Sequence, residues 1–243
     1  MIETEAKAFE MSADHRGGKS EMSSQSERIP TGIPGLDELI EGGVMRNDVH
    51  VLAGGPGTGK TLFSLNFVKN ALAGGERVLY ATFEESPVFL RRNAQLVGID
   101  LSGAEKEKRL TIVDLEALRD SKESTINFMI SALEETESTL IVVDSLTALL
   151  TTSQNELELR TYTKALYKAL RHRHVTSMMT TSILDPLKMG LEAFLADSVM
   201  LLENYMQGTE FRTRFLVLKM RATDHDKQYH SVIFGPGFGV SKY

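Results

Sequence analysis

Apolar residues between about residue 49 and residue 180 follow two alternating patterns. Short continuous apolar runs, typical of parallel strands buried on both faces, predict strands over residues 49–53, 77–83, 110–115, 140–143 and 175–180. Apolar residues spaced three or four apart predict helices over 62–72, 87–97, 126–133 and 156–170. This alternation predicts a mainly parallel sheet flanked by helices.

The pattern changes near the C-terminus. Residues 199–203, 211–219, 228–234 and 238–240 read as strands with no helical stretch between them. Gly208 and the Gly235-Pro236-Gly237 group supply turns. We therefore predict an α/β fold whose parallel core continues into C-terminal antiparallel strands.

The N-terminal segment has a different composition. Residues 1–27 are polar, rich in Ser, Glu and Lys, and show no periodicity, so we expect a disordered extension. One folded domain is expected over residues 28–243. It would open with a turn at Gly32, Pro34 and Gly35, followed by a short apolar helix.

Charge and composition exclude several classes. The net charge is −6, which does not fit a globally basic nucleic-acid binder, and there are no cysteines for disulfides or thiolate metal sites. No apolar stretch approaches the roughly 20 residues that span a bilayer, and the start of the chain lacks a signal-peptide hydrophobic region. We expect a soluble cytoplasmic protein with no membrane partner.

The strongest motif lies at residues 54–61, which read Gly-Gly-Pro-Gly-Thr-Gly-Lys-Thr. They match the phosphate-loop pattern G-x-x-x-x-G-K-[ST] between a predicted strand and a predicted helix. Glycines let backbone N–H groups surround phosphate oxygens, the lysine adds a positive charge, and the last hydroxyl can hold Mg²⁺. The residues expected to bind the nucleotide are Gly55, Pro56, Gly57, Thr58, Gly59, Lys60, Thr61 and Leu62.

Two further elements carry carboxylates at predicted strand ends. Asp144 follows four apolar residues, which matches a Walker B element that would hold Mg²⁺ together with Thr61. Glu84 and Glu85 end the strand at 77–83, where one of them could orient or deprotonate an attacking water. The alternative is that one of the glutamates only caps the helix that follows.

Two groups of charged residues near the C-terminus allow two interpretations each. Lys219 and Arg221 are two apart on one strand, so they should face the same side and could neutralise charge on a transferring phosphoryl group. They could instead be charges on a solvated strand edge. His225 and His230 could suggest a metal site, but their spacing fits ordinary loop residues better.

Together these motifs resemble KaiC-type domains of the RecA/RadA-like branch of phosphate-loop ATPases. The resemblance runs from about residue 28 to the C-terminus, and its most discriminating elements are Phe-Glu-Glu followed much later by Lys-x-Arg. The segments that carry it are residues 29–37, 54–64, 82–85, 142–148, 218–221 and 225–227.

The resemblance implies a RecA-like core and a homo-oligomer, a hexameric ring with ATP between subunits. It assigns Mg-ATP binding to Lys60, Thr61 and Asp144, and catalytic carboxylates to Glu84 and Glu85. By the same resemblance, the cations Lys219 and Arg221 would reach the γ-phosphate of the neighbouring subunit's nucleotide.

The chain also departs from the clock protein that names the family. That protein has two tandem domains, whereas this chain holds one. Its self-phosphorylated Ser/Thr pair corresponds here to Ala193 and Phe194, which have no hydroxyl, so the resemblance does not extend to self-phosphorylation at that place.

Three functions remain open at this point. The first is a slow Mg-dependent ATPase ring that couples nucleotide state to an unknown protein partner. The second is a DNA-handling ATPase of the same fold, although the loops at 151–158 and 182–192 are acidic rather than basic. The third is a nucleotide-state sensor with little turnover in a motility or signalling machine.

Overall fold

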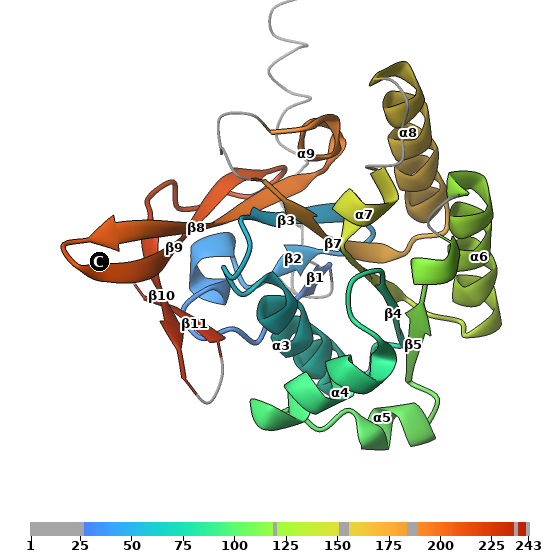
Figure 1. Ribbon diagram of the computed structural model, residues 1–243, viewed down its shortest axis with the longest axis horizontal. Helices are drawn as coiled ribbons and strands as arrows, with labels where there is room; N and C mark the ends of the chain where they lie inside the picture. Colours follow the sequence, from blue (N-terminus) through green and yellow to red (C-terminus); the bar gives the residue numbers. More distant parts are fainter. Residues whose placement is uncertain (1–26, 119–120, 151–155, 184–188, 236–237, 242–243) are drawn as a thin grey trace, which may run out of the picture.

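The computed structural model describes residues 27–118, 121–150, 156–183, 189–235 and 238–241. The expected N-terminal extension therefore lies almost entirely outside the described residues. Within the described residues, nine strands form one sheet in the order β11-β10-β9-β8-β3-β7-β6-β4-β5 (Figure 1). The bounds are β3 (Val49–Gly54), β4 (Val78–Thr82), β5 (Leu110–Asp114), β6 (Leu140–Asp144), β7 (Thr176–Ser182), β8 (Ser198–Gln207), β9 (Glu210–Met220), β10 (His230–Phe234) and β11 (Phe238–Ser241).

The sheet has a parallel part and an antiparallel part, as predicted. Strands β8, β3, β7, β6, β4 and β5 run parallel to one another. Strands β9, β10 and β11 are then added antiparallel beyond β8. Gly208 has a φ of 63° in the turn between β8 and β9, a left-handed conformation that glycine adopts without strain.

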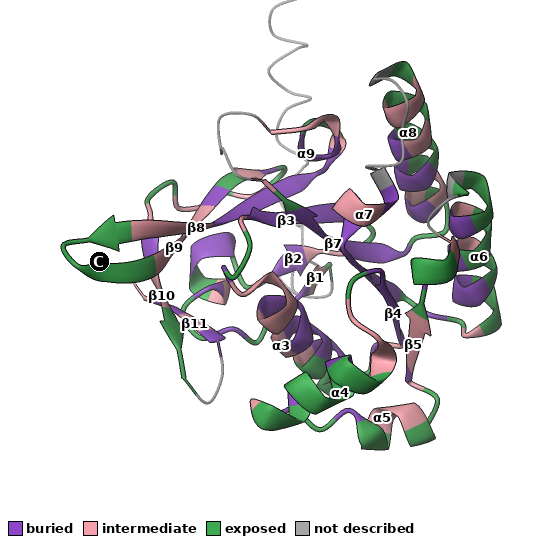
Figure 2. Cartoon of the chain, viewed as in Figure 1, coloured by how far each residue is buried: buried purple, intermediate pink, exposed green. Residues whose placement is uncertain are grey.

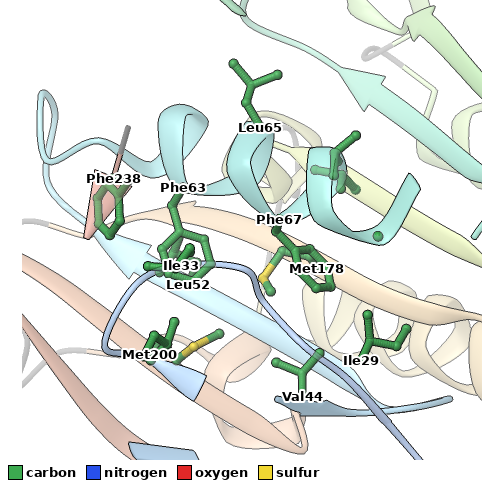
Figure 3. Close-up of a cluster of buried hydrophobic side chains, with 14 of the residues drawn as sticks. Ile29, Ile33, Val44, Leu52, Phe63, Leu65, Phe67, Met178, Met200 and Phe238 are labelled. Atoms are coloured by element: carbon green, nitrogen blue, oxygen red, sulfur yellow. The ribbon is translucent and has the colours of Figure 1, made fainter. Parts of the chain in front are cut away.

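Helices cover both faces of the sheet because successive strand residues point to opposite sides. On one face, alternate strand residues such as Leu52 and Met178 join a core with α3 (Lys60–Ala73) and α4 (Pro87–Leu96) (Figure 3). On the other face, Val51 and Met179 pack with α6 (Lys122–Glu135), α8 (Glu156–His172) and α9 (Leu191–Leu195). The central strands are consequently buried along most of their length (Figure 2).

Several short elements complete the fold. The turn and apolar helix expected after residue 31 appear as the 3-10 helix η1 (Asp37–Ile40), beside the two-stranded sheet of β1 (Arg28–Ile29) and β2 (Val44–Met45). The sequence did not predict α5 (Ser102–Lys106), η2 (Glu116–Leu118), α7 (Leu146–Leu150) or α9. Among the described helices, none combines the length and the apolar content that a bilayer crossing needs.

Candidate nucleotide site

The predicted phosphate loop joins β3 to α3, as the motif requires. Gly57 and Gly59 have φ values of 71° and 92°, a region that side chains rarely adopt. A Cβ on Gly59 would also lie 2.8 Å from Cε1 of Phe234, which packs against the loop from β10. The turn of the backbone therefore favours glycine at both positions, and at Gly59 a close neighbour also excludes a side chain.

Lys60 begins α3 and folds back over the loop. Its ammonium donates hydrogen bonds to the carbonyl oxygens of Gly54 and Gly55, at 3.0 Å each. Burial lowers the pKa of Lys60, and the nearby carboxylates of Asp144 and Glu84 oppose that shift. Both hydrogen-bond partners are neutral, so an anionic phosphate oxygen would be a stronger partner for this ammonium.

Asp144 lies at the end of β6, surrounded by hydroxyl groups. Its carboxylate accepts hydrogen bonds from Thr61 at 2.8 Å, Tyr80 at 2.8 Å and Thr180 at 2.5 Å. Burial, followed by the charge of Asp144, raises the pKa of Tyr80 well above its usual value, so the phenol remains a donor. The hydroxyl of Thr61 and a fixed carboxylate form a set of oxygen ligands that suits Mg²⁺.

Glu84 and Glu85 follow β4 and face the same region. The Ser145 hydroxyl donates to Glu84 at 2.5 Å, and the Asn93 side chain donates to Glu85 at 2.9 Å. Helix α4 is capped by Ser86, whose hydroxyl accepts from the amide of Phe89. The cap position is thus filled by another residue, and the interpretation of a glutamate as the helix cap is wrong.

These groups line one cleft of about 510 Å³ at the carboxyl ends of β3, β4 and β6. Ligands bind at this edge of open α/β sheets, and the volume is typical of small-molecule sites. The cleft brings together the predicted Lys60, Thr61, Glu84, Glu85 and Asp144. Its full lining is Pro56, Gly57, Gly59, Lys60, Thr61, Leu62, Leu65, Glu84, Glu85, Asn93, Val97, Asp144 and Ser182.

Lys219 and Arg221 are not part of this cleft within one chain. Lys219 on β9 pairs with Val199 on β8, and Val199 in turn pairs with Val51 on β3. Val51 lies three residues before Gly54, where the phosphate loop begins. Strand rise and spacing put the Cα of Lys219 about 14 Å from that of Gly54. The two cations therefore lie toward the opposite edge of the sheet from the phosphate loop.

The two cations lie near one another at one corner of the fold, although only Lys219 is on the strand: β9 ends at Met220, and Arg221 follows it. The Lys219 ammonium donates to the carbonyl oxygens of Phe194, at 3.0 Å, and of Ala196. Arg221 donates to Asp197 at 2.9 Å, and Arg171 donates to the other oxygen of that carboxylate. Burial would raise the pKa of Asp197, but the Val49 amide and the two arginines outweigh burial and lower it.

Two of the hydroxyl groups around Asp144 were not predicted from the sequence, those of Tyr80 and Thr180. Thr82 is level with Asp144 on the neighbouring strand, so Tyr80, two residues earlier, points to the same side. Thr180 lies on β7, which adjoins β6 on its other side. Polar residues in apolar strands were the available signal, but strand order decides which of them face Asp144.

The remaining candidates from the sequence have weaker support. Within the described part of the chain, no group of three or more His, Asp or Glu side chains is arranged to hold a metal ion. His230 is buried with its Nε2 3.3 Å from the Asp226 carboxylate. Of the two acidic loops, residues 151–155 and 184–188 lie outside the described residues, and Glu192 is buried in α9.

A comparison with known protein families identifies a family whose model covers the residues of this cleft. A family model described as "ATPase: KaiC" matches residues 29–241. The chain belongs to the KaiC family of ATPases. This confirms the resemblance predicted from the sequence motifs.

Individual KaiC relatives match over most of this chain. The circadian clock oscillator protein KaiC of Picosynechococcus sp. is 33% identical over 228 residues, which cover 88% of this chain and 44% of that protein. KaiC of Thermostichus vulcanus is 30% identical over 241 residues, which cover 93% of this chain and 46% of that protein. The chain thus spans less than half the length of these KaiC proteins.

A solved structure matches along nearly all of its own length. The KaiC-like protein of the hyperthermophilic archaeon Pyrococcus horikoshii has a TM-score of 0.80 and 32% sequence identity. The match covers 88% of this chain and 98% of that chain. The predicted KaiC-type fold, with a mainly parallel sheet and C-terminal antiparallel strands, is therefore confirmed.

Proposed function

We propose that this KaiC-family protein binds Mg-ATP and hydrolyses it slowly, in the cytoplasm. The observation that supports hydrolysis is the cleft in which the loop ammonium of Lys60 and the carboxylates of Glu84 and Asp144 converge. Membership in the KaiC ATPase family supports ATP as the nucleotide. In this proposal, backbone N–H groups of residues 55–61 and the Lys60 ammonium hold the phosphates.

Thr61 and Asp144 would hold Mg²⁺ through their oxygens, and the bound ion would neutralise charge on the phosphates. Glu84 is the better placed of the two glutamates to act on water, because Ser145 fixes its carboxylate beside Asp144. Water oxygen would bond to the γ-phosphorus while the bond from that phosphorus to the β–γ bridging oxygen breaks. Glu84 would take the water proton, and ADP and phosphate would leave.

Replacing both glutamates tests this role. We expect Glu84→Gln combined with Glu85→Gln to leave ATP affinity unchanged and to lower turnover about 100-fold or more, since an amide cannot accept the proton. Calorimetry would give the affinity and phosphate release the rate. The matched control is Glu134→Gln with Glu135→Gln, an adjacent exposed pair on α6, on the other face of the sheet. Wild-type turnover in the first variant would contradict the assignment.

We further propose a ring in which each cleft is completed by Lys219 and Arg221 of the next subunit. Within one chain these cations lie far from the phosphate loop, yet both are held in place by hydrogen bonds. A fixed cation pair with no role in its own cleft fits the arrangement that the KaiC resemblance implies, in which a second copy supplies charge to the transferring phosphoryl group.

Mixing two inactive variants tests the shared site. Lys60→Ala should abolish ATP binding in its own cleft and keep its cations, whereas Arg221→Ala should keep its cleft and lose a cation. In mixed rings that hold the two variants in equal number and random order, about a quarter of the head-to-tail interfaces join an intact cleft to an intact cation pair, so these rings should show about a quarter of the wild-type turnover. Mixed oligomers that stay inactive would show that the site is self-contained.

A further inference from the structure

Helix α9 lies between β7, the strand next to that of Asp144, and the cation pair, of which Lys219 is on β9 and Arg221 directly follows it. It follows β7 in the chain and packs against α8 and β3 (Figure 1). Its first turn carries Glu192, and its last residues present the carbonyl oxygens that accept from Lys219. Because the helix has only five residues, Glu192 and the carbonyl oxygens that hold Lys219 lie within about one turn of each other.

Glu192 is buried, with an exposed fraction of only 7%. Its carboxylate accepts a hydrogen bond from the Thr181 hydroxyl at 3.4 Å, and its backbone carbonyl accepts from Tyr167 at 3.1 Å. The carboxylate also occupies the space that a Cβ at Gly190 would need. A glycine at the start of α9 therefore lets the side chain fold back toward β7.

Thr181, the donor to this carboxylate, is itself held by two neighbouring elements. It pairs with Ala53 at the end of β3, and its hydroxyl lies 3.1 Å from that of Thr147 on α7. The preceding residue, Thr180, points to the other side of the strand and donates to Asp144. The same strand end thus fixes Asp144 on one face of the sheet and α9 on the other.

We infer that Glu192 is a positioning residue: by tying α9 to Thr181, it holds Lys219 and Arg221 where they act on the neighbouring subunit's nucleotide. Lys219 depends on α9 directly, through the carbonyls of Phe194 and Ala196. Arg221 depends on it through Asp197, two residues after the helix ends. The inference rests on the proposed shared site and assigns to it a residue outside both the cleft and the cation pair.

The mixture of Lys60→Ala and Arg221→Ala chains separates this role from a general structural one. Glu192→Ala is placed either in the Lys60→Ala chain, which donates the cations, or in the Arg221→Ala chain, which owns the working cleft. In the cation-donating chain we expect the restored turnover to fall about tenfold or more with an unchanged KM for ATP, because small misplacements of a catalytic group are costly. In the cleft-owning chain we expect no change.

Two further variants keep the test informative. Gly190→Ala keeps Glu192 but pushes its carboxylate away from its present position. Turnover should therefore fall when the cation-donating chain carries this substitution and stay unchanged when the cleft-owning chain carries it. This substitution replaces Glu192→Ala if that variant does not fold. Glu192→Gln keeps an oxygen acceptor for Thr181 and should retain most of the turnover. Glu76→Ala in the cation-donating chain removes another buried carboxylate, one that bonds to Thr139 and Arg46, and should have no effect.

Each outcome of the mixing experiment either supports or overturns the positioning role of Glu192. A loss confined to the cation-donating chain supports the inference, provided that mass measurement shows the mixed oligomers to be intact. An equal loss in both chains, a loss only in the cleft-owning chain, or no loss in either would overturn it. If the parent mixture regains no turnover, the proposed shared site fails first, and the positioning role fails with it.

Discussion

At the scale of single residues, two neighbouring aspartates at the start of the parallel strands have opposite surroundings. Asp197 accepts hydrogen bonds from the Val49 amide and two arginines, which lower its pKa. Burial and the charge of Asp197 raise the pKa of Asp48 from 3.8 to about 6, although Arg171 and Arg221 oppose the shift. Asp48 therefore carries its charge at neutral pH at a cost in stability.

Removing that charge should stabilise the protein in a pH-dependent way. The folded state binds the Asp48 proton more tightly than the unfolded state, so the contribution of this carboxyl to stability falls as pH rises from about 4 to above 6. We expect Asp48→Asn to be more stable than wild type at pH 8 by about 1 kcal/mol, because partial exposure reduces the effect, and equally stable near pH 4.

Urea unfolding at the two pH values would measure this difference. Asp224→Asn, at an exposed loop residue, is the control and should match wild type at both. A stabilisation of Asp48→Asn that is the same at pH 4 and pH 8 would show that titration is not its cause.

At the scale of elements, the antiparallel strands support the phosphate loop. The ring of Phe63, in the first turn of α3, lies 6.3 Å from that of Phe215 on β9 and 5.4 Å from that of Phe238 on β11. Phe234 on β10 meets Phe238 edge-on at 5.7 Å and lies against Gly59. The C-terminal strands thus fix the position of the helix whose N-terminus faces the cleft.

Truncating one of these rings should test that support. Phe238→Ala should lower the free energy of unfolding by about 3 kcal/mol or more, since it removes a fully buried aromatic ring from this cluster. Phe234→Ala, which removes a half-exposed ring, is the comparison and should cost less. If urea unfolding gave the same loss of unfolding free energy for both variants, burial of the Phe238 ring would not be what stabilises this cluster.

The same elements show how far the sequence could predict the fold. The strands from β3 to β11 were recognisable because each is an apolar run or lies between clear turn residues. Helices α5, α7 and α9 have five residues each, too few to show a helical period, and they are stabilised by tertiary packing. Boundaries were less accurate: β8 extends to Gln207, well past the expected 203, because its outer half pairs with β9.

The candidate site was predictable where its signals are local. Lys60, Thr61 and Asp144 belong to short motifs, and the structure brings them together. The hydroxyls of Tyr80 and Thr180 could not be assigned because they depend on strand order. The anchoring of Lys219 could not be foreseen either, since it depends on α9, which the sequence did not reveal.

At the scale of the whole molecule, the two halves of the proposed active site lie on different edges of the sheet. One edge presents the cleft, with exposed apolar residues Val88 and Phe89 at the start of α4 beside Glu85. The other presents Lys219 and Arg221. Since these surfaces differ, copies that contact one another through them would do so head to tail, an arrangement that forms a closed ring when the rotation between neighbours closes and an open filament when it does not.

Nucleotide held between copies should favour their association. We expect the mass in solution to increase when Mg-ATP is added, because a ligand that binds only the assembled form stabilises it. Lys60→Ala should keep the mass of the nucleotide-free protein, and Lys69→Ala, on the exposed side of α3, should respond like wild type. Light scattering with simultaneous phosphate release would measure both properties. A mass that is the same with and without nucleotide would contradict this expectation.

The packing of Phe63 also bears on how the chain is made. Its two ring partners, on β9 and β11, are separated from it by more than half of the sequence. The Val240 amide of β11 likewise donates a hydrogen bond to the carbonyl of Pro34, near the start of the domain, at 2.8 Å. During translation, the N-terminal half emerges from the ribosome long before these partners exist. The ring of Phe63 therefore stays uncovered in the nascent chain until β9 and β11 have emerged, and the phosphate loop that Phe63 supports takes its final form only after those strands have joined the sheet.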